Sequence, residues 1–185
     1  MNKNIDEIRR FVKNKAENND WKYHIVPVVN YSKKLAKTIG VNEEIAELAA
    51  LLHDIGRMVS EDENHHLTGL PVAEKILKKY NYSRKVIDEV KHCIESHRGS
   101  KDIKPRTKTA QIISNADVMA HFDNFPVLIF FGSKKEFKFE EIIKWLDNKI
   151  ERDWRKKLTI PEAKEMMKEK YKAIRLILNS TKKYL

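Results

Sequence analysis

The chain has 185 residues, which suits one domain, or one domain with an appendage, and is long enough to bury a hydrophobic core. Its single cysteine, Cys93, excludes an intrachain disulfide, and a reducing compartment is the simplest expectation. No apolar run is long enough to cross a bilayer or to form a signal peptide, so we expect a soluble, cytoplasmic protein with no membrane partner.

The charge of the chain is strongly positive and uneven. Lys and Arg outnumber Asp and Glu by 37 to 27, which gives a net charge of +10. Residues 133–185 hold 16 of the basic and 9 of the acidic residues, and therefore carry +7 of that charge. A basic surface attracts anions, nucleic acid included. A solvated, lysine-rich surface explains the same counts, and we favour it, so nucleic acid is a possible but not a favoured partner.

Apolar residues recur at helical spacing through nearly the whole chain. In the first half this pattern predicts helices over residues 5–17, 21–39 and 42–55. Asp20 and Asn42 are typical caps for the second and third of these helices, and Gly40 is a typical end for the second.

Residues 60–69 are polar and indicate a loop, and Pro71 then favours the entry of a short helix over residues 72–80. Further helices are expected, in chain order, over residues 83–97, 106–123, 124–132, 139–158 and from 161 onward. Because no segment alternates polar and apolar residues as a strand does, the sequence predicts an all-α fold.

The sharpest local feature is the pair His53-Asp54, which interrupts an apolar helix between Leu-Leu and Ile-Gly. Both side chains would lose hydration there, and a buried carboxylate needs a partner. A divalent cation binds imidazole nitrogen and carboxylate oxygen together and meets both needs. An ordinary hydrogen-bonded His–Asp pair is the alternative.

Two other positions favour a metal site. His24 shares the apolar face of its helix with Val28 and Leu35, where a lone histidine would usually belong to the core. Asp117 shares a face with Ile113 and Ala120, and an ionised carboxylate in such surroundings needs a cation, a network of donors or a raised pKa.

Helical periodicity also separates two nearby histidines. His97 continues the apolar face of Ile87, Val90 and Ile94, so we expect it to point inward. His92 falls on the polar face of the same helix, and we expect it to be exposed.

These motifs together resemble the HD superfamily of metal-dependent phosphohydrolases. The resemblance rests on His24, on His53-Asp54, and on Asp117 within Asn-Ala-Asp, and it covers about residues 21–125. His65, four residues before Gly69, and His97, in Ile-Glu-Ser-His-Arg-Gly, resemble the optional histidines for a second metal in that family. His66 lies in the same segment and is an alternative to His65.

The resemblance implies an HD-domain-like helical bundle with additional C-terminal helices. It implies that His24, His53, Asp54 and Asp117 hold one divalent ion, and that Asp54, His65 and His97 hold a second one, with Asp54 bridging. The donors are all His and Asp, with no Cys, which suits Mn, Fe, Co, Ni or Mg better than structural zinc and leaves the metal and the number of ions, one or two per chain, open.

Arg57 and Arg98 directly follow the two ligand segments. A guanidinium group matches phosphate oxygens in geometry and charge, so these arginines, together with Asp54, are the candidate catalytic residues. The expected activity is hydrolysis of a phosphate ester, a nucleotide or a related small phosphorylated metabolite, by a metal-activated water. An exposed position without a role in binding is the alternative for each arginine.

Two other functions stay open. Some members of the same superfamily are di-iron oxygenases with nearly the same ligands, and the helical scaffold could instead be a nucleotide- or RNA-binding module with a non-catalytic site. Residues 1–132 are expected to form the metal-binding domain. Residues 133–185 are expected to form a basic helical extension that packs on this core or on another subunit, as in a homo-oligomer.

Overall fold

The computed structural model describes residues 3–60, 64–98, 103–134 and 137–185. Every regular element within these ranges is helical, which confirms the all-α prediction. The helices are α1 (Lys3–Lys15), α2 (Asn18–Asp20), α3 (Val26–Ile39), α4 (Glu43–Leu52), α5 (His65–Lys79), α6 (Arg84–Ser96), α7 (Lys108–Asp123), α8 (Phe125–Ser133), α9 (Phe139–Arg152) and α10 (Pro161–Thr181). Two π-helical turns, Trp21–Ile25 and Asp153–Lys157, and a 3-10 turn, Ile55–Met58, interrupt this pattern.

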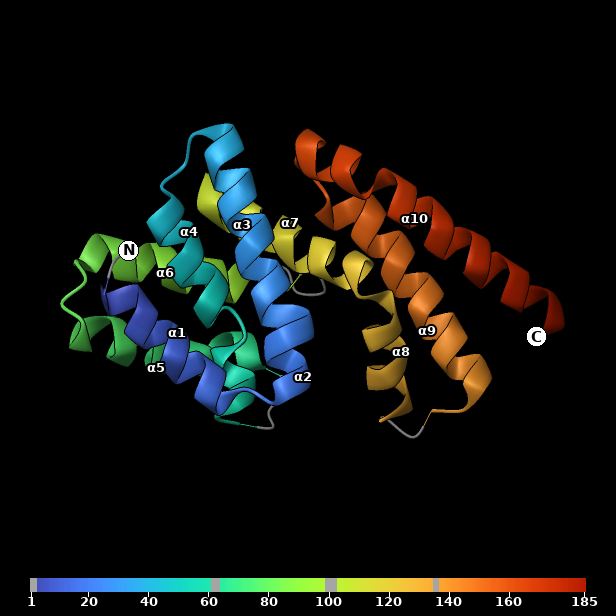
Figure 1. Cartoon of the computed structure of the whole chain (residues 1–185), viewed down its shortest axis with the longest axis horizontal. Helices are drawn as coiled ribbons and strands as arrows, with labels where there is room; N and C mark the ends of the chain where they lie inside the picture. The colour runs from blue at the N-terminus through green and yellow to red at the C-terminus, as the bar shows by residue number, and fades with distance from the viewer. Residues whose placement is uncertain (1–2, 61–63, 99–102, 135–136) are drawn as a thin grey trace.

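Helix α7 is the central element of the fold. Figure 1 shows it crossing the middle of the molecule, with α1–α6 on one side and α8–α10 on the other. A helix that meets other helices on all sides must be apolar or small all round. All of residues 109–120 of α7 except Gln111 are buried, and they include the polar Ser114, Asn115 and Asp117. Ser114, Asn115 and Asp117 are therefore inside the protein, where their polar groups need partners.

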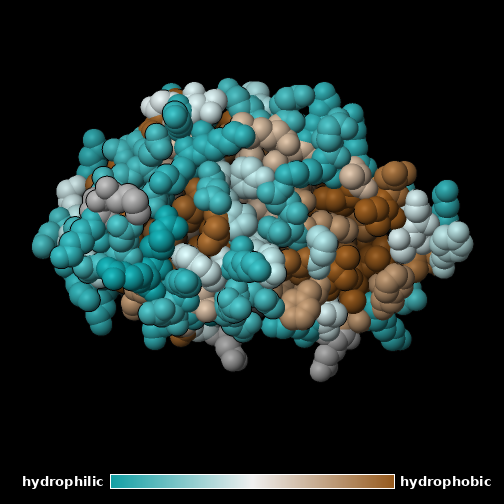
Figure 2. Space-filling model, viewed as in Figure 1, coloured by the Kyte–Doolittle hydropathy of each residue, from teal (hydrophilic) through white to brown (hydrophobic). Residues whose placement is uncertain are grey.

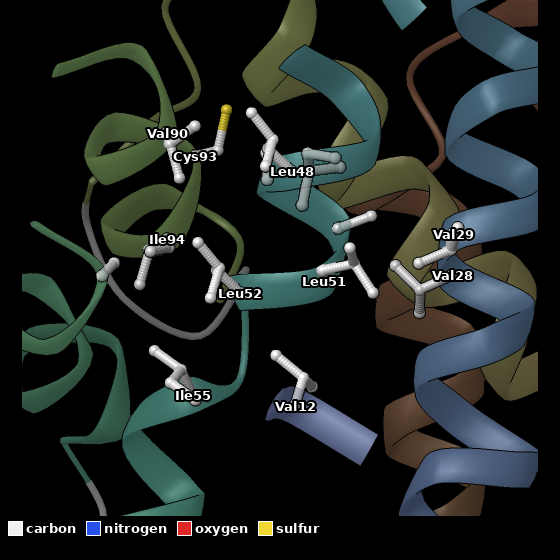
Figure 3. Close-up of a cluster of buried hydrophobic side chains, with 14 of the residues drawn as sticks. Val12, Val28, Val29, Leu48, Leu51, Leu52, Ile55, Val90, Cys93 and Ile94 are labelled. Carbon is white, nitrogen blue, oxygen red and sulfur yellow. The ribbon is translucent and has the colours of Figure 1, made fainter. Parts of the chain in front are cut away.

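Two hydrophobic clusters lie on either side of α7. The first joins α1, α3, α4, α5, α6 and one face of α7. Figure 3 shows its centre, where Leu48 and Leu52 of α4 face Cys93 and Ile94 of α6, and Leu51 lies on the side of Val28 of α3. The second cluster joins the other face of α7 and parts of α3 and α4 to α8, α9 and α10. The C-terminal extension therefore packs on the core of this same chain.

Two of the three predicted helix-end signals, Asn42 and Gly40, are confirmed, and Ser83 is a further cap. The Asn42 side chain accepts a hydrogen bond from the Ile45 N–H, and Ser83 caps α6 in the same way. Gly40 has a positive φ of 71° and ends α3. The prediction that Asp20 is a cap was wrong, because the chain is already helical from Asn18 and continues through Asp20 without a cap bond.

Helix α5 begins at His65, so the prediction of a loop up to residue 69 and a helix from residue 72 was wrong. Pro71 lies inside this helix, where it removes one backbone hydrogen bond. The first two turns of α5 bury His65, His66 and Gly69. This packing outweighs the local preference of proline for the start of a helix.

The two ends of the molecule have different surfaces. Figure 2 shows mostly polar surface over α1–α6 and apolar surface over α8 and α9. Ile129 and Phe130 of α8 and Phe139 of α9 are among the exposed apolar side chains. Within the described part of the chain, no helix is both long and apolar enough to cross a membrane.

Candidate metal centre

His53 and Asp54 lie where α4 ends. Helix α4 stops at Leu52, and Asp54 leaves helical geometry with φ −107° and ψ 16° before the 3-10 turn Ile55–Met58 begins. This change of direction lets two adjacent side chains face the same interior space. His53 is fully buried and Asp54 is 7% exposed.

His24 reaches this pair from the π-helical turn Trp21–Ile25. Pro27 has no N–H to donate to the Tyr23 carbonyl, and that carbonyl instead accepts a hydrogen bond from the Asn124 side chain at 2.8 Å. π-Helical turns are rare and often lie at functional sites. The His24 Nε2 atom lies 3.0 Å from His53 Nε2 and 3.3 Å from Asp54 Oδ2.

Asp117, from the middle of α7, lies beside His24 and completes the first group of donors. Its Oδ1 atom is 3.6 Å from His24 Nε2. His24, His53 and Asp117 each offer one donor atom, and these three atoms all lie within 4.8 Å of one another. This separation is compatible with shared coordination of a single ion.

A second group of donors consists of Asp54, His65 and His97, and their atoms also lie within 4.8 Å of one another. His65 begins α5 and His97 follows the end of α6. Their Nε2 atoms lie 3.1 Å and 3.4 Å from Asp54 Oδ1. His66 is buried as well but is in neither group, so His65 is the histidine of this segment that the structure brings to the site.

Asp54 stands between the two groups. Its Oδ2 atom faces His24 at 3.3 Å and His53 at 3.5 Å, while its Oδ1 atom faces His65 and His97. One carboxylate therefore presents one oxygen to each group, which is the arrangement of a bridging ligand.

Backbone contacts define which ring nitrogen faces the centre in two of the histidines. His53 Nδ1 lies 2.7 Å from the Ala50 carbonyl oxygen, and His97 Nδ1 lies 2.6 Å from that of Ile94. Because a carbonyl can only accept, each Nδ1 carries the proton. In its neutral form such a ring presents an unprotonated Nε2 to the interior, and metal-binding histidines are commonly oriented by such a bond.

The donor set fits a divalent cation. Asp54 Oδ1 and His65 Nε2 are buried and, among the described residues, have no hydrogen-bond partner of acceptable geometry. Buried polar atoms without a partner are costly. An unprotonated Nε2 atom of His53 or His97 would also repel the oxygen of Asp54 that it faces. A cation between these atoms would remove both costs. Imidazole and carboxylate together suit the transition-metal dications.

Burial and neighbouring charges act in opposite directions on the pKa values of the two carboxylates, whereas burial dominates at His53. Burial lowers the pKa of His53 to about 4, so this imidazole stays neutral. Burial alone would raise the pKa of Asp54, but Arg57 and the surrounding imidazoles together hold it well below its usual value. Burial would likewise raise the pKa of Asp117, but Lys157 and nearby imidazoles hold it well below its usual value. The site therefore offers ionised carboxylates and neutral imidazole.

Of the two candidate catalytic arginines, Arg57 has a defined place beside the site. Its Nε atom lies 3.2 Å from Asp54 Oδ1, and 58% of its side chain is exposed. One side of the guanidinium can therefore meet a substrate while another contacts the ligand. Arg98 is half-buried directly after His97.

The prediction that His92 is exposed was wrong. His92 is 8% exposed, its Nε2 accepts a hydrogen bond from the Arg106 N–H at 2.9 Å, and its Nδ1 donates to Glu95 Oε1 at 2.8 Å. The segment before α7 covers this polar face of α6, where Glu89 also accepts a bond from Thr107. Periodicity identifies the face of a helix but not a segment that packs on its polar side.

Sequence reasoning missed several polar residues beside Asp117. His121, one turn further along α7, stacks on the His24 ring with centroids 5.1 Å apart. Two buried residues of the C-terminal extension also lie here: Lys157 contacts Asp117, and Asp153 lies near His121. The spacing of four residues between Asp117 and His121 was a signal that could have found His121. No local pattern connects Lys157 to a site 40 residues earlier in the chain.

Comparisons with known proteins agree with this geometry. A family model described as HD domain matches residues 21–121. Ribonuclease Y from Symbiobacterium thermophilum is 34% identical over 99 residues, which are 52% of this chain but only 17% of that protein. An uncharacterized protein from Clostridium beijerinckii is 27% identical over 123 residues, covering 64% of this chain and 72% of that protein.

A solved structure extends the likeness over almost the whole chain. The crystal structure of a predicted HD superfamily hydrolase from an uncultured Thermotogales bacterium matches with a TM-score of 0.65. The match covers 97% of this chain and 92% of the other at 19% identity, so it shows a shared fold that includes the C-terminal helices. The family model covers more than half of the chain, and all six candidate ligands lie within the residues that it matches. On this evidence, the chain belongs to the HD domain family.

Proposed function

We propose that this protein is a metal-dependent phosphohydrolase that holds two divalent ions, one in each donor group. The observation that carries the proposal is the position of Asp54, whose two oxygens face the two groups separately. With Asp54 shared, the first group offers four protein donors and the second offers three among the described residues, which would leave open positions on a six-coordinate ion, and open positions are typical of catalytic sites.

The chain's own residues supply the rest of the chemistry. When bound, a pair of divalent ions would lower the pKa of a water and offset the negative charge of the phosphoryl oxygens. Asp54 would hold the two groups at a fixed separation, and the buried, neutral His53 would keep a lone pair directed at the centre. Arg57 would bind a phosphoryl oxygen with the part of its guanidinium that is exposed.

The substrate is proposed to be a nucleotide or another small phosphorylated metabolite. Ribonuclease Y is named for action on RNA, a phosphodiester, and part of it is 34% identical to 99 residues of this chain. The net charge of +10 favours an anionic substrate in general. A small substrate is favoured because Asp54 and its neighbours lie in the protein interior.

Metal-dependent hydrolysis tests this proposal, followed as phosphate release from monoesters and diphosphates and by separation of the products for cyclic dinucleotides. The purified protein, stripped of metal with a chelator, is supplied in turn with Mn, Co, Ni, Fe or Mg and screened against nucleoside monophosphates, nucleoside diphosphates, cyclic dinucleotides and sugar phosphates. Asp54→Asn is compared with Asp88→Asn, because Asp88 is an exposed carboxylate paired with Arg84 on the surface.

The proposal expects activity that needs added metal, that is lost in Asp54→Asn and that is kept in Asp88→Asn. Oxygen consumption with iron, without hydrolysis of any of these substrates under any metal, would replace the proposal with an oxygenase. Salt-sensitive RNA binding that survives Asp54→Asn, again without hydrolysis, would replace it with a binding module.

A further inference from the structure

The C-terminal extension contributes a buried ammonium group to the metal centre. Lys157 ends the π-helical turn Asp153–Lys157, and it is only 7% exposed. Its Nζ atom donates to Asp117 Oδ2 at 2.7 Å, across 40 residues of sequence. Lysine is rarely buried to this extent without a specific partner, and here the partner is a candidate metal ligand.

The two oxygens of Asp117 have different surroundings. Oδ1 faces the first donor group and lies 3.6 Å from His24 Nε2. It is also 3.7 Å from Nε2 of His121, which is outside that group. Oδ2 is occupied by Lys157. A carboxylate held by one oxygen can rotate little, so Oδ1 is kept in the direction of the centre.

Asn115 fixes the segment that carries Lys157. Its Oδ1 atom accepts hydrogen bonds from the N–H groups of Thr159 at 3.0 Å and Ile160 at 3.1 Å. Its Nδ2 atom donates to Thr159 Oγ1 at 3.1 Å. Asn115 is two residues from Asp117 on the same helix. Helix α7 therefore carries the ligand Asp117 and, through Asn115, also holds the segment that positions Lys157.

A second buried carboxylate limits the repulsion between Lys157 and a bound cation. Asp153 is fully buried at the other end of the same π-helical turn. Its oxygens are contacted by Lys149 at 3.0 Å and by Arg152 at 3.1 Å. The charges of Asp117 and Asp153 both act on the ammonium group of Lys157, so it does not face the centre as an uncompensated charge.

We propose that Lys157 is a positioning residue of the metal centre: it holds Asp117 Oδ2 so that Asp117 Oδ1 is oriented for the ion, which makes the C-terminal extension part of the site. The proposal rests on the metal centre of the proposed function. The opposite role, in which the ammonium group competes with the ion for Asp117, predicts a change of the opposite sign. Measured metal affinity therefore decides between the two roles.

The test compares Lys157→Met with Lys156→Met. Methionine preserves most of the length of the lysine side chain without its charge, and Lys156 is the exposed neighbour in the same turn. The dissociation constant for Mn²⁺ is measured by titration calorimetry, and the visible spectrum of bound Co²⁺ reports the geometry of the ligands. We expect Lys157→Met to bind Mn²⁺ about 10- to 100-fold more weakly and to change the Co²⁺ spectrum, as loss of an outer hydrogen bond to a ligand typically does.

Two further variants, Lys157→Arg and Lys156→Met, test whether the charge at position 157 is what matters. Lys157→Arg keeps a cationic donor and is expected to recover part of the lost affinity, and Lys156→Met is expected to match the wild type. A purely structural role of Lys157 would lower the melting temperature without changing the Co²⁺ spectrum. If circular dichroism shows that Lys157→Met does not fold, Lys157→Gln replaces it with the same expectation.

The possible results separate this proposal from the proposed function. Unchanged or tighter Mn²⁺ binding in a folded Lys157→Met protein would overturn the positioning role while leaving the metal centre in place. A wild-type protein that binds no Mn²⁺ or Co²⁺ would overturn the proposed function, and the role of Lys157 with it.

Discussion

Gly56 lies against the backbone of His65 so closely that a Cβ atom on Gly56 would be 2.0 Å from the His65 carbonyl oxygen. The same Cβ would lie 2.9 Å from the backbone nitrogen of Gly69, one turn further along α5. The 3-10 turn after Asp54 and the first turn of α5 can therefore approach each other only because position 56 has no side chain. This contact brings His65 to Asp54 and forms the second donor group.

Gly56→Ala is expected to separate α5 from the 3-10 turn. The added methyl group meets backbone atoms, which cannot move as a flexible side chain can, so we expect a loss of about 1–3 kcal/mol or more in the free energy of unfolding. We also expect loss of the ion that His65 helps to hold. Urea unfolding and Mn²⁺ stoichiometry measure the two effects.

Gly132→Ala is the matched control for that variant. A Cβ atom at Gly132 would meet side-chain atoms of Ile142 at 3.1 Å, in the second hydrophobic cluster and away from the donors. It is expected to leave the Mn²⁺ stoichiometry unchanged. A Gly56→Ala protein with full stability and full metal content would show that the close contact does not position His65.

His92→Ala is expected to weaken the fold but not the metal site. The imidazole joins Glu95 of α6 to the backbone N–H of Arg106, and its loss removes both of these partly buried hydrogen bonds. We expect a cost of about 1–3 kcal/mol in the free energy of unfolding, with Mn²⁺ affinity retained. His97→Ala on the same stretch of chain is expected to lose metal instead. Loss of metal in His92→Ala would mean that this histidine contributes to the centre.

The metal-free protein is expected to lose stability as the pH falls from about 6.5 toward 4. Burial lowers the pKa values of His53, His65 and His121, so the unfolded chain takes up these protons before the folded chain does. Such groups stabilise the fold above their unfolded pKa, and this stability is lost as the pH decreases. Each extra proton bound by the unfolded chain changes the stability by about 1.4 kcal/mol per pH unit.

His24 works in the opposite direction. Burial would lower its pKa, but the hydrogen bond and the charge of Asp54 raise it above the usual value. This group favours the folded state at low pH, and its contribution is lost as the pH rises through the raised pKa. Because three histidines have lowered pKa values and His24 has a raised one, the metal-free protein is still expected to lose stability as the pH falls. Urea unfolding in the presence of a chelator at about pH 7 and about pH 5 measures it, and equal stability at both would contradict these shifts.

Arg57→Ala is expected to impair substrate binding more than metal binding. Its guanidinium is largely exposed beside Asp54, and one charge-assisted hydrogen bond to a phosphate is worth about 1.5–3 kcal/mol. We therefore expect kcat/KM to fall about 10- to 100-fold while the Mn²⁺ affinity stays within a few-fold of the wild type. Arg57→Lys should be intermediate because it loses the forked geometry, and Arg155→Ala, at an exposed position of the extension, should be silent. An unchanged kcat/KM in Arg57→Ala would exclude it from the site.

The apolar surroundings of the candidate ligands made the first part of the site predictable from sequence. His53, Asp54 and Asp117 interrupt apolar helices, and helical periodicity placed His97 inside, where it is 3% exposed. The same reasoning failed for His92, because the segment before α7 covers the polar face of α6. Periodicity describes one helix at a time and contains no information about what packs on it.

The features that could not be predicted all depend on contacts between distant segments. The early start of α5 at His65 depends on its contact with Gly56, which outweighs the signal of Pro71. The place of Lys157 beside Asp117 depends on how the extension packs against α7. In the sequence Lys157 is one of three consecutive basic residues, and only the fold distinguishes it from Arg155 and Lys156, which are exposed.

The number of metal ions per chain tests the central claim most directly. The wild-type protein is stripped with a chelator, incubated with Mn²⁺, freed of excess metal and measured by elemental analysis, beside Asp54→Asn treated in the same way. Because Asp54 presents one oxygen to each donor group, we expect two ions per wild-type chain and loss of both in the variant. A wild-type protein that retains no ion, with Mn²⁺ or with Co²⁺, Ni²⁺ or Fe²⁺, would contradict the metal centre and the hydrolytic function built on it.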